Sequence, residues 1–281
     1  MIFVQTKEKL DEEINFFLKK NEIISIVPTM GNLHKGHLSL IKLAKNYSTK
    51  VVVTIFVNPL QFGENEDFKD YPRTIDKDLK KLKKSGCDLL FFPINDKEVF
   101  PEKNKISIIN SGKLGKILCG KMRPGHFDGV LTVVNQLFTI SKPNIAVFGA
   151  KDYQQQILIK KMSKNKFPKL KIITGPIVRD TNGLALSSRN NYLNKKEKLI
   201  APHFYKSLKK GVEIFKDTKD INYTINSVRN LLLKKKFEVE YLEIRTRELD
   251  KIINFDLKSK LVLLGSIKLG TTKLIDNIDL H

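Results

Sequence analysis

The chain has 281 residues, of which 41% are hydrophobic, and its formal net charge is +21. This length is enough for one large domain or two smaller ones with buried cores. No uninterrupted apolar run reaches the roughly 18 residues of a membrane span, and the first residues turn acidic where a signal peptide would continue apolar. We therefore expect a cytoplasmic protein with no membrane partner.

Cysteine content and charge narrow the class further. Cys87 and Cys119 are too few for a disulfide framework and lack the paired spacing of a zinc site. The positive charge makes a basic nucleic-acid-binding protein one hypothesis, because lysine and arginine neutralise phosphate backbones. The lysines, however, are scattered over predicted helix faces, so we expect no nucleic-acid partner. Turns rich in Gly, Pro or Ser hold the arginines best suited to a bidentate anion contact, namely Arg73, Arg123, Arg179 and Arg189.

Short apolar runs alternate with helical patterns along the first part of the chain, which is typical of βαβ units and a parallel sheet. The expected strands are residues 23–27, 51–57, 89–92, 145–148 and 172–178. Helical spacing of apolar residues lies between them, around residues 38–45, 79–82 and 130–137. We predict an α/β fold with a doubly wound, Rossmann-like parallel sheet over residues 1–176.

The pattern changes after residue 178. Two long polar helical stretches, residues 195–215 and 221–236, precede strand patterns at 237–245, 260–268 and 272–278. Glycines separate these strand patterns, which favours a small antiparallel sheet. The sequence therefore predicts a second, smaller α+β domain over residues 177–281.

The tetrad His34-Lys35-Gly36-His37 lies between the first predicted strand and a helical pattern that opens near Leu38. A strand that ends in a glycine-containing turn before a helix presents backbone N–H groups and a positive dipole end to phosphate. Histidines also occur as structural residues or helix caps. The position between strand and helix favours a phosphate site with two adjustable imidazole donors.

Other polar segments follow the remaining strands, where ligands bind in open α/β sheets. Lys151 could meet phosphate oxygens while Asp152 accepts from ribose hydroxyls. The segment Ser187 to Arg189 suits a pyrophosphate leaving group, although a capping turn is the alternative interpretation. Gln61 and Gln155, taken alone, could equally be solvated residues.

Residues 161–165 read KMSKN and are similar to the KMSKS phosphate loop of class I aminoacyl-tRNA synthetases. The segment falls at the end of a predicted helix and before the strand at 172–178. A phosphate loop should follow that strand, where residues 187–189 lie. We therefore expect residues 161–165 to be helical and to have no role at the site.

Taken in order, several segments resemble the pantoate–β-alanine ligase (pantothenate synthetase) family of the HxGH nucleotidyltransferase superfamily. They are PTMGNLHKGH (28–37), FVNPLQF (56–62), YPR (71–73), RPGHFDGV (123–130), FGAKDYQQQ (148–156), GLALSSRN (183–190) and LIDN (274–277). The resemblance implies ATP-dependent condensation of (R)-pantoate with β-alanine through a pantoyl adenylate, which yields pantothenate, AMP and pyrophosphate. The alternative is another HxGH nucleotidyltransferase that retains AMP in its product.

The resemblance also implies residue roles. His34, His37, Lys151 and Arg189 would be catalytic, with His37 as general acid. ATP would contact Met30, Gly31, Asn32, Leu33, His34, Lys35, Gly36, His37, Gly149, Ala150, Lys151, Asp152, Val178, Leu186, Ser187, Ser188 and Arg189. Pantoate would bind Gln61 and Gln155, and the acyl pocket would be lined or covered by Asn58, Tyr71, Arg123 and His126. Mg²⁺ should accompany ATP without an identified protein ligand, Asp78 being a weak candidate. A homodimer is expected, with the second domain contributing the 187–189 phosphate loop and a lid.

Overall fold

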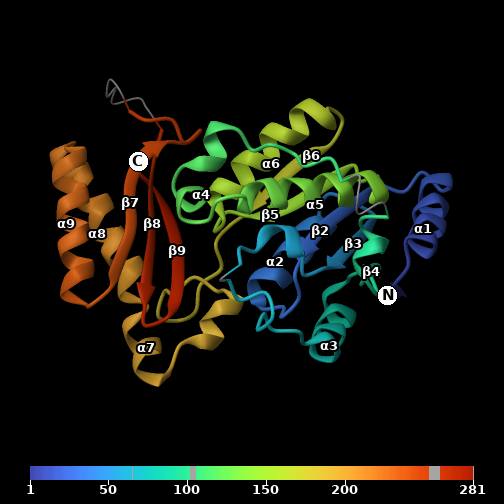
Figure 1. The fold of residues 1–281 in the computed structure, drawn as a ribbon, viewed down its shortest axis with the longest axis horizontal. Coiled ribbons are helices and arrows are strands. Elements are labelled where there is room, and N and C mark those ends of the chain that lie inside the picture. The colour runs from blue at the N-terminus through green and yellow to red at the C-terminus, as the bar shows by residue number, and fades with distance from the viewer. Residues whose placement is uncertain (65, 102–105, 253–259, 281) are drawn as a thin grey trace. The chain divides into compact units, whose positions relative to one another are not determined.

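A computed structural model describes residues 1–64, 66–101, 106–252 and 260–280 of the chain (Figure 1). The described chain divides into two compact units. The first comprises Met1–Ala150 and Gln154–Pro176, and the second comprises Lys151–Tyr153 and Ile177–His281. Of the described helices, none combines the length and apolar character needed to cross a membrane.

The first unit contains a parallel sheet that, within the described residues, has six strands in the order β1-β4-β3-β2-β5-β6. These are β1 (Ile2–Val4), β2 (Ile24–Thr29), β3 (Lys50–Ile55), β4 (Leu89–Phe91), β5 (Ile145–Gly149) and β6 (Lys171–Gly175). The chain moves outward from β2 through β3 to β4 and then returns to place β5 against the other side of β2. This reversal puts a ligand-binding switch point at the carboxyl ends of β2 and β5.

Helices cover both faces of this sheet, which confirms the doubly wound architecture (Figure 1). One face packs against α2 (Lys35–Lys45) and α3 (Ile75–Ser85) through Ile41, Ala44 and Leu82. The other packs against α1 (Lys7–Lys19), α5 (His126–Ser141) and α6 (Tyr153–Lys166). Each fully buried aliphatic or aromatic side chain contributes about 1.5–3 kcal/mol. The short α4 (Cys119–Met122) precedes α5.

The N-terminal strand β1 and helix α1 are elements that the sequence analysis did not predict. Strand β1 is short and pairs with β4 at the edge of the sheet. Helix α1 starts at the N-cap Thr6, whose hydroxyl accepts from the Lys9 N–H, and buries Leu10, Ile14 and Phe17. This spacing of four and three residues is a helical periodicity that could have been found in the sequence.

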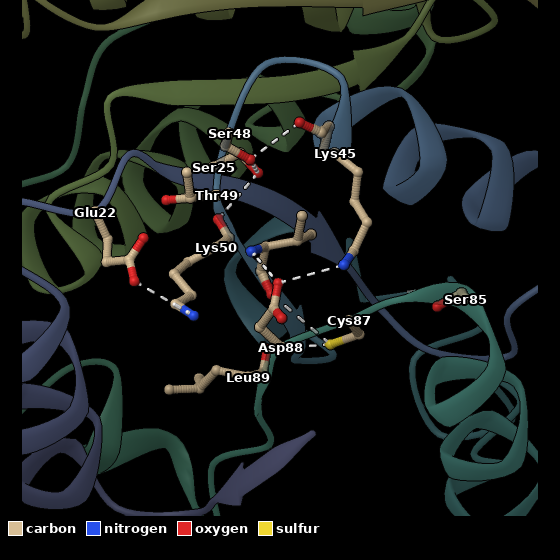
Figure 2. Close-up of polar contacts among 12 residues, drawn as sticks. Glu22, Ser25, Lys45, Ser48, Thr49, Lys50, Ser85, Cys87, Asp88 and Leu89 are labelled. Atoms are coloured by element: carbon tan, nitrogen blue, oxygen red, sulfur yellow. Dashed lines mark hydrogen bonds and ion pairs between the residues drawn. The ribbon is translucent and has the colours of Figure 1, made fainter.

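Polar contacts at the start of β3 and β4 link these strands to each other and to the end of α2 (Figure 2). The Asp88 carboxylate accepts from the Val51 N–H at 2.8 Å and lies 3.8 Å from the Lys45 ammonium. The adjacent Cys87 thiol donates to the Leu89 carbonyl at 3.2 Å, and burial raises its pKa to about 12. Cys87 is therefore a buried structural thiol.

The second unit contains an antiparallel sheet that, in the described part of the chain, has the order β7-β8-β9. Its strands are β7 (Glu238–Thr246), β8 (Leu261–Leu269) and β9 (Thr272–Leu280). Helix α8 (His203–Thr218) packs against β9, and α9 (Ile221–Lys234) packs against both α8 and β7. The predicted small antiparallel sheet is confirmed.

Proline explains two of the differences between predicted and observed element boundaries. The helical stretch expected at residues 195–215 is interrupted, because α7 (Lys195–Ile200) ends before Pro202 and α8 begins after it. The strand expected at residues 172–178 ends at Gly175, directly before Pro176. Proline has no N–H for a helix or ladder hydrogen bond, so regular structure stops at these positions.

Candidate active site

The histidine tetrad forms the N-terminus of α2, which begins at Lys35 rather than near Leu38. The N-cap His34 accepts at Nδ1 from the Gly36 N–H at 3.2 Å, and His37 accepts at Nδ1 from the His34 N–H at 3.3 Å. The two rings stack with centroids 4.0 Å apart. Because both Nδ1 atoms accept, each ring carries its proton on Nε2. Helix capping therefore makes each imidazole a donor at Nε2.

The turn between β2 and this helix has a left-handed backbone at Gly31 (φ +83°) and Asn32 (φ +48°). Glycine adopts this conformation without steric cost, and asparagine is among the few other residues that tolerate it. A Cβ at Gly31 would also lie 3.1 Å from the Ile55 side chain. The PTMGN segment therefore forms a tight turn that leads the backbone into the helix N-terminus.

Asp78, in the first turn of α3, anchors this turn. Its fully buried carboxylate accepts from the Asn32 and Leu33 N–H groups, each at 2.8 Å, and from the Thr74 hydroxyl at 3.0 Å. The Lys81 ammonium donates to the Leu33 carbonyl. The suggestion that Asp78 binds Mg²⁺ does not fit these contacts, since its oxygens already accept protein hydrogen bonds. Among the described residues, no group of three or more His, Cys, Asp or Glu side chains is arranged to hold a metal ion.

Gln61 lies in a buried polar network after β3. It ends the 3₁₀ turn Pro59–Gln61, which Asn58 caps, and its Oε1 accepts from Asn58 Nδ2 at 3.1 Å. Its Nε2 lies 3.1 Å from the Met30 sulfur. Asn58 also donates to the Gly129 carbonyl, and a Cβ at Gly129 would overlap the Leu60 carbonyl. Gln61 is therefore a buried, oriented amide, and the interpretation as a solvated loop residue is wrong.

Arg123 and His126 hold the backbone of Gln61. His126 Nδ1 lies 2.7 Å from the Gln61 carbonyl oxygen, and its Nε2 lies 2.9 Å from Arg123 Nη1. A guanidinium only donates, so Nε2 accepts and Nδ1–H donates to the carbonyl. Arg123 also forms a bidentate pair with Glu66. Burial alone would raise the pKa of Glu66, but hydrogen bonding to the Arg123 guanidinium and its charge lower that pKa below its usual value.

The glutamines of α6, residues 154–156, differ in burial and in their hydrogen-bond partners. Gln154 donates to the Leu114 and Ile117 carbonyls at 2.8 Å, and Gln156 accepts from the Thr174 hydroxyl at 2.7 Å. Gln155, between them, is only partly buried. The KMSKN segment lies within α6 with Met162 and Ser163 buried, which confirms that it is helical. Strand β5 ends at Gly149. The N–H of the next residue, Ala150, donates to the Gly175 carbonyl at the end of β6 at 2.8 Å.

In the second unit, Lys151 is mostly buried, and its Nζ lies 3.7 Å from the exposed Asp152 carboxylate. A narrow hairpin pairs the Leu186 N–H with the Val178 carbonyl at 2.9 Å. Ser187 then caps a 3₁₀ helix, Ser188–Tyr192, by accepting from the Arg189 N–H at 3.3 Å. The SSR segment is therefore a capped turn in which the Ser187 hydroxyl accepts from the Arg189 N–H.

The arginines expected to contact anions are mostly engaged by the protein itself, which corrects that expectation. Arg73 donates to backbone carbonyls of the 68–71 segment, and Arg123 pairs with Glu66. Arg179 pairs with Asp276 and stacks on a tyrosine ring. The sequence showed turns around these arginines but not their partners, which for Arg123 and Arg179 lie 57 and 97 residues away along the chain.

A doubly wound parallel sheet with imidazole donors at a helix N-terminus beside its switch point defines an HxGH-type, nucleotide-dependent enzyme. The family model for pantoate-beta-alanine ligase matches residues 2–279. The chain therefore belongs to the pantoate–β-alanine ligase family, and the resemblance seen in its sequence is confirmed.

Individual relatives are similar to this chain over nearly its full length. The pantothenate synthetase of Buchnera aphidicola subsp. Acyrthosiphon pisum is 46% identical over 99% of this chain and 98% of its own. A pantothenate synthetase structure from Thermus thermophilus superposes with a TM-score of 0.91 at 35% identity, covering 100% of both chains. A Francisella tularensis pantoate–β-alanine ligase, solved with "Beta-gamma ATP" and β-alanine, has a TM-score of 0.81 at 35% identity, covering 99% of this chain and 97% of its own.

Proposed function

We propose that this chain is an ATP-dependent ligase that condenses (R)-pantoate with β-alanine to give pantothenate, AMP and pyrophosphate. The observation that carries the proposal is the HxGH turn, in which reciprocal capping makes both imidazoles Nε2 donors at the N-terminus of α2. Family membership supplies the substrates. The relative solved with an ATP compound and β-alanine supports the same substrate class.

The chemistry has two steps. A pantoate carboxylate oxygen attacks the α-phosphorus of ATP, a P–O bond forms, and the bond to the β-phosphate oxygen breaks with release of pyrophosphate. The β-alanine amine then attacks the acyl carbon of the adenylate, loses a proton, and expels AMP. Negative charge grows on the phosphates in the first step, so preorganised donors are the main requirement. His34 and His37 supply such donors beside a positive helix end, with His37 as general acid.

We assign ATP binding to both units. In the first, the contacts come from the 30–37 turn and from Gly149 and Ala150. In the second, Lys151, Arg189 and the hydroxyls of Ser187 and Ser188 act on the phosphates, Asp152 lies on the ribose side, and Val178 and Leu186 contribute backbone contacts. These side chains offer the cationic and hydroxyl groups that a departing pyrophosphate needs. The first unit is then the catalytic domain, and the second contributes the 187–189 phosphate loop and a lid.

We assign pantoate binding to Gln61 and Gln155. An amide has two N–H donors and a carbonyl with two lone pairs, and the contacts of Gln61 with Asn58 and Met30 use only part of this capacity. The remaining donor and acceptor suit a substrate with hydroxyl groups. Arg123 and His126 act on Gln61 by holding its backbone carbonyl.

Further parts of the proposal concern the cation, the assembly and the location. Mg²⁺ enters as the MgATP substrate and is held mainly by phosphate oxygens and water. The enzyme is cytoplasmic and forms a homodimer through its first unit. Gel filtration with light scattering tests the dimeric state.

In the decisive experiment, purified protein is incubated with ATP, pantoate and β-alanine, and the formation of AMP and pantothenate is measured. We expect AMP and pantothenate to appear in equal amounts only when all three substrates are present. With ATP and pantoate alone, we expect pantoate-dependent exchange of label between pyrophosphate and ATP. If AMP instead remains joined to the product after β-alanine is added, the chain is a nucleotidyltransferase that retains AMP, and the ligase proposal fails.

A further inference from the structure

The LIDN segment of β9 is a family-like motif to which the proposed reaction assigns no role. Its last two residues, Asp276 and Asn277, are adjacent in the strand and are both buried. Successive side chains of a strand point to opposite faces, so these two residues contact different parts of the second unit. Both sets of contacts lead to segments assigned to the phosphates.

Asp276 holds the hairpin that leads into the SSR segment. Its carboxylate forms a bidentate pair with Arg179, which lies 97 residues earlier in the chain. The same guanidinium donates to the Gly183 carbonyl inside the hairpin, and it lies 3.4 Å from the ring centroid of Tyr205. Asp276 is 3% exposed and Arg179 is 15% exposed, so this ion pair is shielded from solvent. The hairpin is therefore fixed at its base by a planar, directional contact.

Asn277 holds the other segment. Its Nδ2 donates to the backbone carbonyl of Lys151 at 3.1 Å, across 126 residues of sequence. The backbone N–H of Asn277 in turn donates to Asp276 Oδ1 at 2.8 Å, so the contacts of the two residues form one connected network. Through this network, two neighbouring residues of β9 join the Lys151 segment to the hairpin before Ser187.

We propose that Asp276 and Asn277 are positioning residues for adenylate formation. They set the spacing between Lys151 and the Ser187–Arg189 segment, so that both meet the phosphates of one ATP molecule. The inference rests on the proposed function, because it assumes that these segments bind phosphate. Charge stabilisation depends on donors already in place when charge develops, and a displacement of about 1 Å can cost about 100-fold in rate.

The test compares the two half-reactions in Asp276→Asn and Asn277→Leu. Asp276→Asn keeps the side-chain size but loses the charge that pairs with Arg179, and Asn277→Leu removes the donor to Lys151. We expect pantoate-dependent pyrophosphate exchange to fall about 100-fold in kcat/KM for ATP. Formation of pantothenate from supplied pantoyl adenylate and β-alanine should stay within about twofold of the parent, since no pyrophosphate is involved. Glu240→Gln is the matched control, because Glu240 is 4% exposed and pairs with Lys273 in the same sheet.

The outcomes separate the possibilities. Equal loss of both half-reactions in a folded variant would show a merely structural role and overturn the inference, as would unchanged exchange in both variants. If Asp276→Asn does not fold, Asn277→Leu, which leaves the ion pair in place, decides the question alone. A parent enzyme without pantoate-dependent exchange would instead refute the proposed function.

Discussion

Replacing Asp78 tests whether this residue anchors the turn between β2 and α2 or binds Mg²⁺. Its carboxylate accepts from the N–H groups of Asn32 and Leu33 and has no exposed surface. A hydrogen bond to a charged group contributes about 1.5–3 kcal/mol, so losing both in Asp78→Ala should cost about 3–6 kcal/mol of unfolding free energy. That is a large share of the roughly 5–15 kcal/mol typical of a folded protein. Asp78→Asn keeps one acceptor oxygen and should lose about half as much.

The matched control is Asp76→Asn. Asp76 lies in the same first turn of α3 but is exposed, and its removal should change the unfolding free energy by no more than about 0.5 kcal/mol. Urea unfolding measures stability, and pyrophosphate exchange at several Mg²⁺ concentrations measures adenylation. We expect Asp78→Asn to be less stable and slower, with the Mg²⁺ concentration for half-maximal rate unchanged. Parent-like stability together with a large rise in that Mg²⁺ concentration would refute the anchor and identify a metal ligand.

Three further perturbations test other parts of the molecule. His37→Ala or Lys151→Ala should slow pyrophosphate exchange by about 10²–10³ while leaving the circular dichroism spectrum unchanged, and near-parent exchange in both would contradict the assignment. Because the pKa of Glu66 is lowered in the fold, its pairing with Arg123 stabilises the protein above about pH 4.3 and is lost as pH falls through the folded pKa. Urea unfolding from pH 6 to 3 should therefore show a weaker acid-induced loss in Glu66→Gln than in the parent, and identical profiles would argue against the pair. Cys87, with its pKa raised to about 12, should resist iodoacetamide at pH 8 until the protein is unfolded, as peptide mass spectrometry can show; rapid labelling of the native protein would contradict its burial.

Much of the fold follows from local sequence patterns. Short continuous apolar runs identify β2 to β6, because parallel strands that are buried on both faces of the sheet need apolar residues on both faces. The ends of elements were less predictable. Helix α2 begins at Lys35 because the His34 imidazole caps it, which apolar periodicity does not reveal. The short edge strand β1 depends on pairing with β4, a segment more than 80 residues away.

The candidate site divides in the same way. The order and spacing of the motifs by themselves identified the family and indicated candidate segments for its chemistry, since those segments are contiguous in sequence. Tertiary structure alone decided what each side chain does: which imidazole nitrogen donates, that Asp78 anchors a backbone turn, and that Arg179 pairs with Asp276. Hydrogen bonds and ion pairs depend on distances of about 3 Å between groups that can be a hundred residues apart. Such distances are set by the packing of the whole chain, and no local pattern of residues encodes them.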